Sequence, residues 1–263
     1  TDATEIELKL NFSEDSIKTY NEDVLEEFVA RAYLGSVILE GGKEKLVWGK
    51  GDKLHVLDNF CATDYTDFIY PDYIDRRLAV PMFRAVFNAP SGSFRAEAVY
   101  APMLVTDRFA SDGYWKPAAV TTLTSSVKSI ADATLSGLYG GTVTPTYVKQ
   151  MSAAGSLSAD DLYPETKTLK YGQYGARVTG TAGSFDWGLS YYYGRNKQPS
   201  VDSAKLASYV SDYIKNGGTS SLDTGIDYDR LQVFGLEGAK AFGGLNTRFE
   251  VAYNLTDDVS GND

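Results

Sequence analysis

The stretch SFDWGLSYYYGRN, residues 184–196, decides how the fold of this chain is interpreted. Successive side chains of an extended strand point to opposite sides. One side of this stretch then carries large apolar or aromatic groups: Phe185, Trp187, Leu189, Tyr191 and Tyr193. The other side carries mostly small or polar groups: Asp186, Gly188, Ser190 and Tyr192. A soluble β-sandwich would bury the first side, whereas a membrane β-barrel would expose it to lipid and turn the second side towards its lumen.

The same alternation recurs in strand pairs joined by tight turns. Residues 82–100, 174–193 and 230–255 each show two alternating runs around a short turn rich in Gly, Ser or Ala. Residues 28–42 predict a fourth pair, and residues 5–12 alternate as a single strand. These patterns are typical of β-hairpins. The alternation does not assign faces to two outgoing strands, 37–47 and 230–241.

Long polar connections separate these pairs, so that short turns and long loops alternate along the chain. The connections are residues 13–25, 48–75, 104–167 and 195–228. Structureless loops of this length are uncommon in compact soluble domains, whereas a membrane barrel has short turns at one rim and long loops at the other. Two loops contain helix-like pieces, 125–138 and 203–218, which we expect to fold inward as a constriction or to cap the mouth.

The sequence therefore predicts an all-β fold, an antiparallel up-and-down transmembrane β-barrel with short periplasmic turns and long extracellular loops. We expect one domain over residues 1–263 with about eight to ten strands. The polar end TDDVSGND brings no aromatic-ended final strand, so we expect a fragment that lacks strands at one or both ends. Aromatic residues near strand ends fit the girdles of such a barrel. These are Trp48, Tyr100, Tyr171 and Tyr193.

Composition excludes several classes of protein. A formal net charge of −10 disfavours nucleic acid as a partner, because phosphate binding needs clustered Lys and Arg. Cys61 and His55 are each the single residue of their type, which excludes an internal disulfide and disfavours a zinc site or a hydrolytic triad. No apolar run is long enough for a membrane helix. The sequence predicts neither an enzyme nor a cofactor, and calcium binding by the aspartate-rich stretch 48–75 is left open.

Charged side chains are expected opposite the apolar faces of the strands. They are Arg31, Arg84, Arg95, Glu97, Arg177, Asp186, Arg248 and Glu250. A soluble core would have to pair each of these charges, whereas a watery lumen can hold them. We predict that they line a pore that selects polar or anionic solutes. An alternative of equal weight is that these charged side chains pair across neighbouring strands and stabilise the barrel wall.

Residues 41–108 resemble a group of Gram-negative outer-membrane β-barrel proteins of unknown function. The resemblance rests on a strand that ends in a spaced Gly-Trp-Gly, a Val-Leu-Asp, a loop rich in Asp and Pro, and a strand entered through Arg-x-x-x-Pro-Met. The matching residues are Trp48, Gly49, Asp58, Arg77, Pro81, Met82, Tyr100 and Pro102. The stretch NFCATDY departs from the usual Asn-Pro of that family, which leaves the shape of this loop open. The resemblance implies a porin-like barrel that belongs to a longer protein.

Together these observations predict a porin-like channel in the outer membrane of a Gram-negative-type cell, which passes small polar or anionic solutes. Its partners would be the lipid bilayer and these solutes, and a homo-oligomer is left open. One alternative is a surface adhesin or structural barrel that uses its long loops. Another is a soluble, Tyr-rich β-sandwich that binds carbohydrate by ring stacking.

Overall fold

The computed structural model describes residues 3–51, 56–66, 72 and 74–257. Contacts within the chain divide these residues into two compact units. The first unit holds the strands of the large sheet, and the second comprises residues 109–165 and 198–229 of the described chain. The sequence predicted one domain, and two of its long loops turn out to contain enough helix to build a core of their own.

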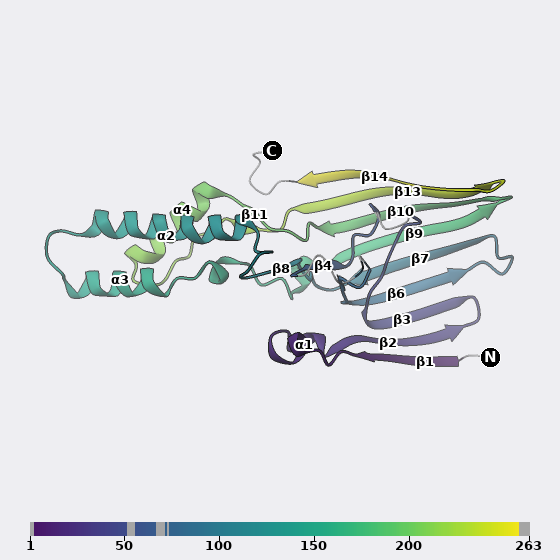
Figure 1. Ribbon diagram of the computed structural model, residues 1–263, viewed down its shortest axis with the longest axis horizontal. Coiled ribbons are helices and arrows are strands. Elements are labelled where there is room, and N and C mark those ends of the chain that lie inside the picture. Colours follow the sequence, from purple (N-terminus) through teal and green to yellow (C-terminus); the bar gives the residue numbers. More distant parts are fainter. Residues whose placement is uncertain (1–2, 52–55, 67–71, 73, 258–263) are drawn as a thin grey trace. The chain divides into compact units, whose positions relative to one another are not determined.

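The first unit is built on one antiparallel sheet of nine strands (Figure 1). The strands are β1 (Ala3–Leu10), β2 (Leu25–Leu34), β3 (Val37–Glu44), β6 (Val80–Asn88), β7 (Phe94–Ala101), β9 (Gln173–Ala182), β10 (Phe185–Arg195), β13 (Arg230–Phe242) and β14 (Leu245–Asp257). They lie side by side in chain order, and every neighbouring pair is antiparallel. The predicted up-and-down order of antiparallel strands is confirmed.

Short turns and long connections alternate as predicted. The turns that join β2 to β3, β6 to β7, β9 to β10 and β13 to β14 span few residues. Gly183 and Gly243 adopt φ values of 64° and 59°. Tight hairpin turns require such positive φ values, and residues other than glycine rarely adopt them. In an up-and-down sheet these four turns all lie at one end of the strands, and the long connections all lie at the other.

The long connections carry the remaining elements. The first holds α1 (Glu14–Lys18) and η1 (Asn21–Asp23). Three short strands, β4 (Ala62–Tyr65), β5 (Arg77–Leu78) and β8 (Arg108–Phe109), form a small sheet in the order β5-β4-β8. The elements η3 (Leu169–Tyr171), η2 (Ala159–Leu162), β11 (Ser200–Val201) and β12 (Ile226–Asp227) complete the connections.

The second unit is a small helical body made of α2 (Ala118–Leu138), α3 (Pro145–Ser156) and α4 (Ser203–Lys215). Asp202 caps the N-terminus of α4, and its carboxylate accepts hydrogen bonds from the backbone N–H groups of Ala204 and Lys205. Its buried side chains recur at helical spacing and join a core with residues of α2. Both predicted helical pieces are confirmed as helices. Each packs within this unit's own core. The constriction or cap that these pieces would form stays a prediction.

One face of the nine-stranded sheet, called here the apolar face, stays exposed. Its large side chains include Ile6, Leu8, Leu39, Phe83, Phe87, Phe94, Leu189, Phe234, Leu236, Phe249, Val251, Tyr253 and Leu255, all of them exposed. The pairing registers place these residues on one side, including those of β3 and β13 whose faces the sequence left open. Within the described residues the other sheets have only two and three strands, so no second large sheet covers this face as a β-sandwich would require.

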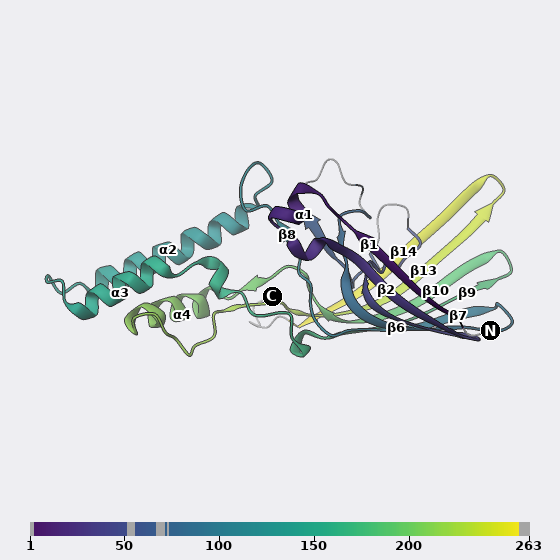
Figure 2. The same cartoon turned by 90° about the horizontal axis from the view of Figure 1, so that it is seen from below.

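The sheet is strongly curved, as Figure 2 shows, but it is not closed. β1 and β14 are its two edge strands, and neither pairs with a further strand of the described chain on its outer side. The side of the sheet opposite the apolar face carries the charged residues and is called here the charged face. In the described part of the chain, no helix is both long enough and apolar enough to cross a membrane.

Candidate functional site on the charged face

The charged face carries a row of alternating glutamates and arginines that crosses the sheet. This charge row consists of Glu7, Arg31, Glu40, Arg84, Glu97, Arg177 and Glu237, from β1 to β13. Arg84 lies 2.8 Å from Glu40 and 3.0 Å from Glu97, and Arg177 lies 2.5 Å from Glu237. The remaining contacts in the row range from 2.8 Å, between Arg31 and Glu7, to 3.5 Å. Each arginine is therefore shared between two carboxylates.

A glycine makes the last step of the charge row possible. β10 lies between β9 and β13, and its residue Gly188 pairs with Thr179 on one side and Glu237 on the other. A Cβ on Gly188 would come within 2.4 Å of the Glu237 carboxylate. Without that Cβ, Glu237 reaches across β10 to Arg177. Glu237 is only 1% exposed, so the pairing offsets the large cost of removing its charge from water.

The connection between β3 and β6 lies on the charged face. We call its described residues 45–51 and 56–66 the inner segment. Trp48 and Phe60 pack edge to face with ring centroids 5.2 Å apart, and Phe60 packs in the same way on Tyr192 of β10 at 5.1 Å. Together with Met82 and Val233 of the sheet they form a buried core. The inner segment therefore packs on the charged face of the sheet.

Two glycines of the sheet receive the inner segment. A Cβ on Gly175 would meet the rings of both Phe60 and Trp48 at 2.7 Å, and one on Gly235 would meet Leu57 at 2.6 Å. Real Cβ atoms do not approach so closely, so the bulky side chains fit only because the strands carry no side chain there. The complementarity between small residues on the strands and large ones on the connection fixes where the inner segment lies.

Glu250 of β14 holds the tip of the inner segment. Its carboxylate accepts hydrogen bonds from the backbone N–H of Gly51, at 2.5 Å, and of Val56, at 2.9 Å. Gly49 approaches the same carboxylate so closely that a Cβ would lie 2.3 Å from Glu250 Oε1. Gly49 also has a φ of 114°, in the region that favours glycine. The Trp-Gly pair of the inner segment thus combines a buried anchor with a backbone that must pass close to Glu250.

A buried ion pair joins the inner segment to the strand entry before β6. Asp58 lies 2.6 Å from Arg77, and their side chains are 1% and 6% exposed. Arg77 also donates a hydrogen bond to the hydroxyl of Thr63 at 3.1 Å. Both residues belong to the set on which the family resemblance rests. This contact fastens the middle of the connection to its last residues before β6.

Lys197 lies in a largely buried polar cluster at the end of β10. Its ammonium group donates hydrogen bonds to Gln173 Oε1 and, at 3.3 Å, to the hydroxyl of Tyr192. Burial lowers the pKa of Lys197 to about 7, and the positive charge of Arg77 acts in the same direction. The neighbouring Cys61, Asp107 and Asp58 oppose this shift without cancelling it. Burial also raises the pKa of Cys61 to about 12, so its thiol stays protonated.

We expect the stability of the first unit to rise with pH between about 7 and 8 because of Lys197, below the range in which the thiol of Cys61 ionises in the unfolded chain. In this window the lysine is protonated in the unfolded chain, with its ordinary pKa near 10.4, but largely neutral in the folded one. The free energy of unfolding then rises by up to about 1.4 kcal/mol per pH unit. Urea unfolding at a series of pH values measures this slope. The Lys197→Met variant should lose the slope, and an equal slope in both proteins would contradict the prediction.

A polar pocket of about 330 Å³ opens at the hairpin end of the charged face. It is lined by residues of the β6–β7 and β9–β10 hairpins together with Lys50 from the inner segment. Lys50 lies 3.9 Å from Asp186, and Arg95 lies 3.8 Å from Glu97. Thr181 donates a hydrogen bond to Asp186 at 2.6 Å, which orients that carboxylate. These cations are paired more loosely than the arginines in the middle of the charge row.

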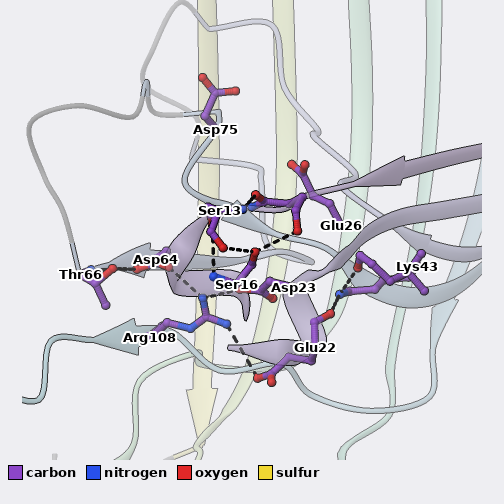
Figure 3. A network of polar contacts seen from close by, with 12 residues as sticks. Ser13, Ser16, Glu22, Asp23, Glu26, Lys43, Asp64, Thr66, Asp75 and Arg108 are labelled. Carbon is purple, nitrogen blue, oxygen red and sulfur yellow. Dashed lines mark hydrogen bonds and ion pairs between the residues drawn. The ribbon is translucent and has the colours of Figure 1, made fainter. Parts of the chain in front are cut away.

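A second polar cleft, of about 270 Å³, lies at the opposite end, among the long connections. Figure 3 shows Arg108 between carboxylates: it donates hydrogen bonds to Asp23 at 2.6 Å and to Asp64 at 3.0 Å. Its guanidinium also stacks on Tyr20, 3.8 Å from the ring centroid. Burial alone would lower the pKa of Arg108, but the bond to Asp23 and the surrounding carboxylates raise it overall. The cluster joins two connections to β8 and leaves Arg108 little capacity to bind an anion.

The predicted pore-lining residues all belong to strands of the sheet and lie on the charged face. Arg31, Arg84, Glu97 and Arg177 belong to the charge row, which favours the alternative of pairing across strands for these four. Arg95 and Asp186 line the polar pocket, and Glu250 holds the inner segment. Arg248 lies two positions before Glu250 on β14 and so on the same face. The sequence alone did not indicate Lys50, Glu237 or Lys197, because the role of each depends on contacts with residues far along the chain.

Other predicted residues have different positions from those expected. Trp48 and Tyr171 are each 1% exposed, so they are not part of an aromatic girdle at the apolar face, and that prediction is wrong for both. Tyr100 and Tyr193 do lie on the apolar face, where Tyr100 stacks on Tyr174 at 4.9 Å. Of the other family-motif residues, Met82 is buried with Trp48, Pro81 pairs with Lys43 in the sheet, and Pro102 follows β7.

Metal binding finds no support in the described residues. There, no group of three or more His, Cys, Asp or Glu side chains is arranged to hold a metal ion. His55, which the triad argument considered, lies outside the described residues, as do Asp52 and Asp67 of the aspartate-rich stretch. Comparison of the chain with protein-family models, with curated proteins and with solved structures returned no match. The resemblance of residues 41–108 to outer-membrane barrels therefore stays a prediction.

Proposed function

We propose that the nine-stranded sheet is part of the wall of a β-barrel in the outer membrane of a Gram-negative-type cell, and that its charged face lines a passage for small polar or anionic solutes. The observation that carries this proposal is the exposed apolar face, which extends over the sheet from β1 to β14. Soluble monomeric proteins rarely expose a contiguous apolar surface of more than a few hundred Å². A lipid bilayer is the solvent in which such a face is stable.

The charged face supports the same proposal from the other side. In a barrel wall, side chains alternate between apolar groups towards lipid and polar groups towards the interior, strand by strand. The charge row and the polar pocket both lie opposite the apolar face. The strand lengths also fit, since β10 has 11 residues and β13 and β14 have 13 each, whereas about 9 to 11 tilted residues cross the hydrocarbon.

The open edges place a condition on this proposal. Backbone N–H and C=O groups that face lipid must be hydrogen-bonded, because no water reaches them. The outer edges of β1 and β14 therefore have to pair with strands beyond the nine, or with a second copy of the sheet. Under this proposal the number of strands, and with it the width of the passage, is set by the partners of these two edges.

Spin labels test which solvent the two faces contact. Cysteines are introduced in turn at Phe83, Leu189 and Val251 on the apolar face, and at Ser190 and Thr179 on the charged face, in a Cys61→Ala background. In lipid vesicles we expect the first three labels to be quenched by oxygen, which concentrates in hydrocarbon, and the last two by a water-soluble nickel complex. Shielding of the apolar-face labels from both quenchers would contradict the proposal, because that face would then be covered by protein.

Planar-bilayer recording tests the passage itself. The full chain, reconstituted under conditions in which the labels report lipid contact, should give stepwise conductance in potassium chloride. The absence of conductance steps would contradict the channel but leave the membrane-wall part of the proposal standing.

A further inference from the structure

We propose that the polar pocket at the hairpin end of the charged face is a binding site for a small solute that carries a carboxylate or a phosphate group. This inference rests on the proposed function in one respect, namely that the charged face is open to solutes. It adds the position of the site and the chemical group that the site recognises.

The pocket contains cations that keep hydrogen-bond donors available. Among the residues that the structure describes, Lys50 and Arg95 approach a carboxylate no closer than 3.9 Å and 3.8 Å, beyond the length of an ordinary charge-assisted hydrogen bond. By contrast, Arg84 in the charge row lies within 3.0 Å of two carboxylates. The nearest carboxylates thus reduce the charge of Lys50 and Arg95 without using their N–H groups, which remain able to bind an oxyanion.

The balance of charge in the pocket favours an anion. Its lining includes two positive side chains, Lys50 and Arg95, and one negative side chain, Asp186. Arg95 and Asp186 are about half exposed, at 46% and 48%, so a solute reaches them without displacing the core. The carboxylate of Asp186 already accepts a hydrogen bond from Thr181 and can accept another from a hydroxyl or ammonium group of the ligand.

The size and lining fit a small polar molecule. A volume of about 330 Å³ lies at the lower end of the range of small-molecule sites. Asn88, Thr179 and Thr181 add polar side-chain groups around the charges. The pocket opens on the charged face, opposite the side that we assign to lipid, which favours a free solute over a lipid head group as the source of the anion.

The position of Lys50 in the pocket is fixed by the inner segment. Glu250 accepts hydrogen bonds from the backbone N–H of Gly51 and Val56. Trp48 anchors the preceding residues in the core. Lys50 lies between the buried Trp48 and the hydrogen-bonded Gly51. Its ammonium group therefore points towards the β9–β10 hairpin and lines the pocket.

Isothermal titration of the detergent-solubilised full chain tests this site, with sodium phosphate, sodium acetate and glycerol as probes at constant ionic strength. We expect phosphate and acetate to bind and glycerol not to bind. Lys50→Gln and Arg95→Gln should each weaken phosphate binding about tenfold, since each removes a charge-assisted hydrogen bond. Asp186→Asn should strengthen it about threefold by removing a repulsive charge. Lys18→Gln, which removes an exposed lysine of α1, is the matched control and should leave the affinity unchanged.

Three other results would contradict the proposed anion site. Absence of phosphate and acetate binding, or equal affinity in Lys50→Gln, Arg95→Gln and the parent protein, rules out an anion site here. Equal binding of glycerol shows a neutral-polyol site instead. Loss of phosphate binding when anionic phospholipid is added to the micelles would indicate a head-group site. Titration in detergent needs neither a bilayer nor conductance. Anion binding can therefore be observed even if no conductance is found, and conductance can be observed even if no anion binds.

Discussion

Replacing Arg177 by Met should lower the free energy of unfolding of the sheet by about 3–5 kcal/mol. Arg177 lies 2.5 Å from Glu237 and 3.5 Å from Glu97. Its loss takes the cation away from Glu237, whereas Glu97 keeps Arg84 at 3.0 Å. Glu237 is 1% exposed and Glu97 is 7% exposed. A buried carboxylate without its cation carries most of its desolvation cost uncompensated. Urea unfolding in detergent, followed by the β-sheet signal in circular dichroism, measures the loss.

Two further variants separate the ion pair from a general packing defect. The double variant Arg177→Met, Glu237→Gln removes both charges and should recover most of the loss, because no buried charge is left unpaired. Arg95→Met is the matched control: its side chain is 46% exposed and its pair distance is 3.8 Å, so we expect a loss of less than about 1 kcal/mol. A loss below about 1 kcal/mol for Arg177→Met as well would show that water solvates the charge row.

Replacing Trp48 by Ala should cost about 3–5 kcal/mol and release the inner segment from the charged face. Trp48 is 1% exposed and packs on Phe60 and against Gly175, whose missing side chain provides the space. The neighbouring Gly175 has no side chain that could move into the cavity left by the indole. Urea unfolding measures the stability, and proteolysis at Lys45 and Lys50 measures release, because both peptide bonds should become susceptible to trypsin.

Trp115→Ala provides the control for the loss of an indole. Trp115 is 38% exposed and belongs to the second unit, so we expect a loss of less than about 1 kcal/mol and no new cleavage in the inner segment. In the proposed channel, release of the inner segment also widens the passage, so Trp48→Ala should increase the size of the conductance steps. Trypsin resistance equal to that of the parent protein would show that Glu250 and the Asp58–Arg77 pair hold the segment without Trp48.

The alternation of side chains predicted most of the large sheet. The hairpins around residues 82–100, 174–193 and 230–255 form as expected, and β1 matches the alternating run at 5–12. Local periodicity is sufficient here, because a one-residue slip in register would move the whole apolar side of a strand to the other face of the sheet. The same reasoning placed Arg84 and Glu97 on one face, where the structure has them.

The sequence did not predict which connection lies on the charged face. Helical periodicity in 125–138 and 203–218 correctly indicated helices, but not that they would share a core with each other. Nothing in the pattern of residues 45–66 distinguishes a solvated loop from one that packs on a sheet. That outcome depends on Gly175 and Gly235, which lie on strands far along the chain and leave space for Phe60, Trp48 and Leu57.

The sequence by itself determined the strands, their order and the chemical difference between the two faces of the sheet, because these follow from a repeat of two residues and from turn chemistry. The tertiary structure alone decided which charges pair and where Lys50 lies. The hydrogen bond from Gly51 to Glu250 joins residues 199 positions apart, and that from Val56 to Glu250 joins residues 194 apart. Contacts over such separations depend on the curvature of the whole sheet, which brings its strands around the inner segment and is not encoded in any single stretch.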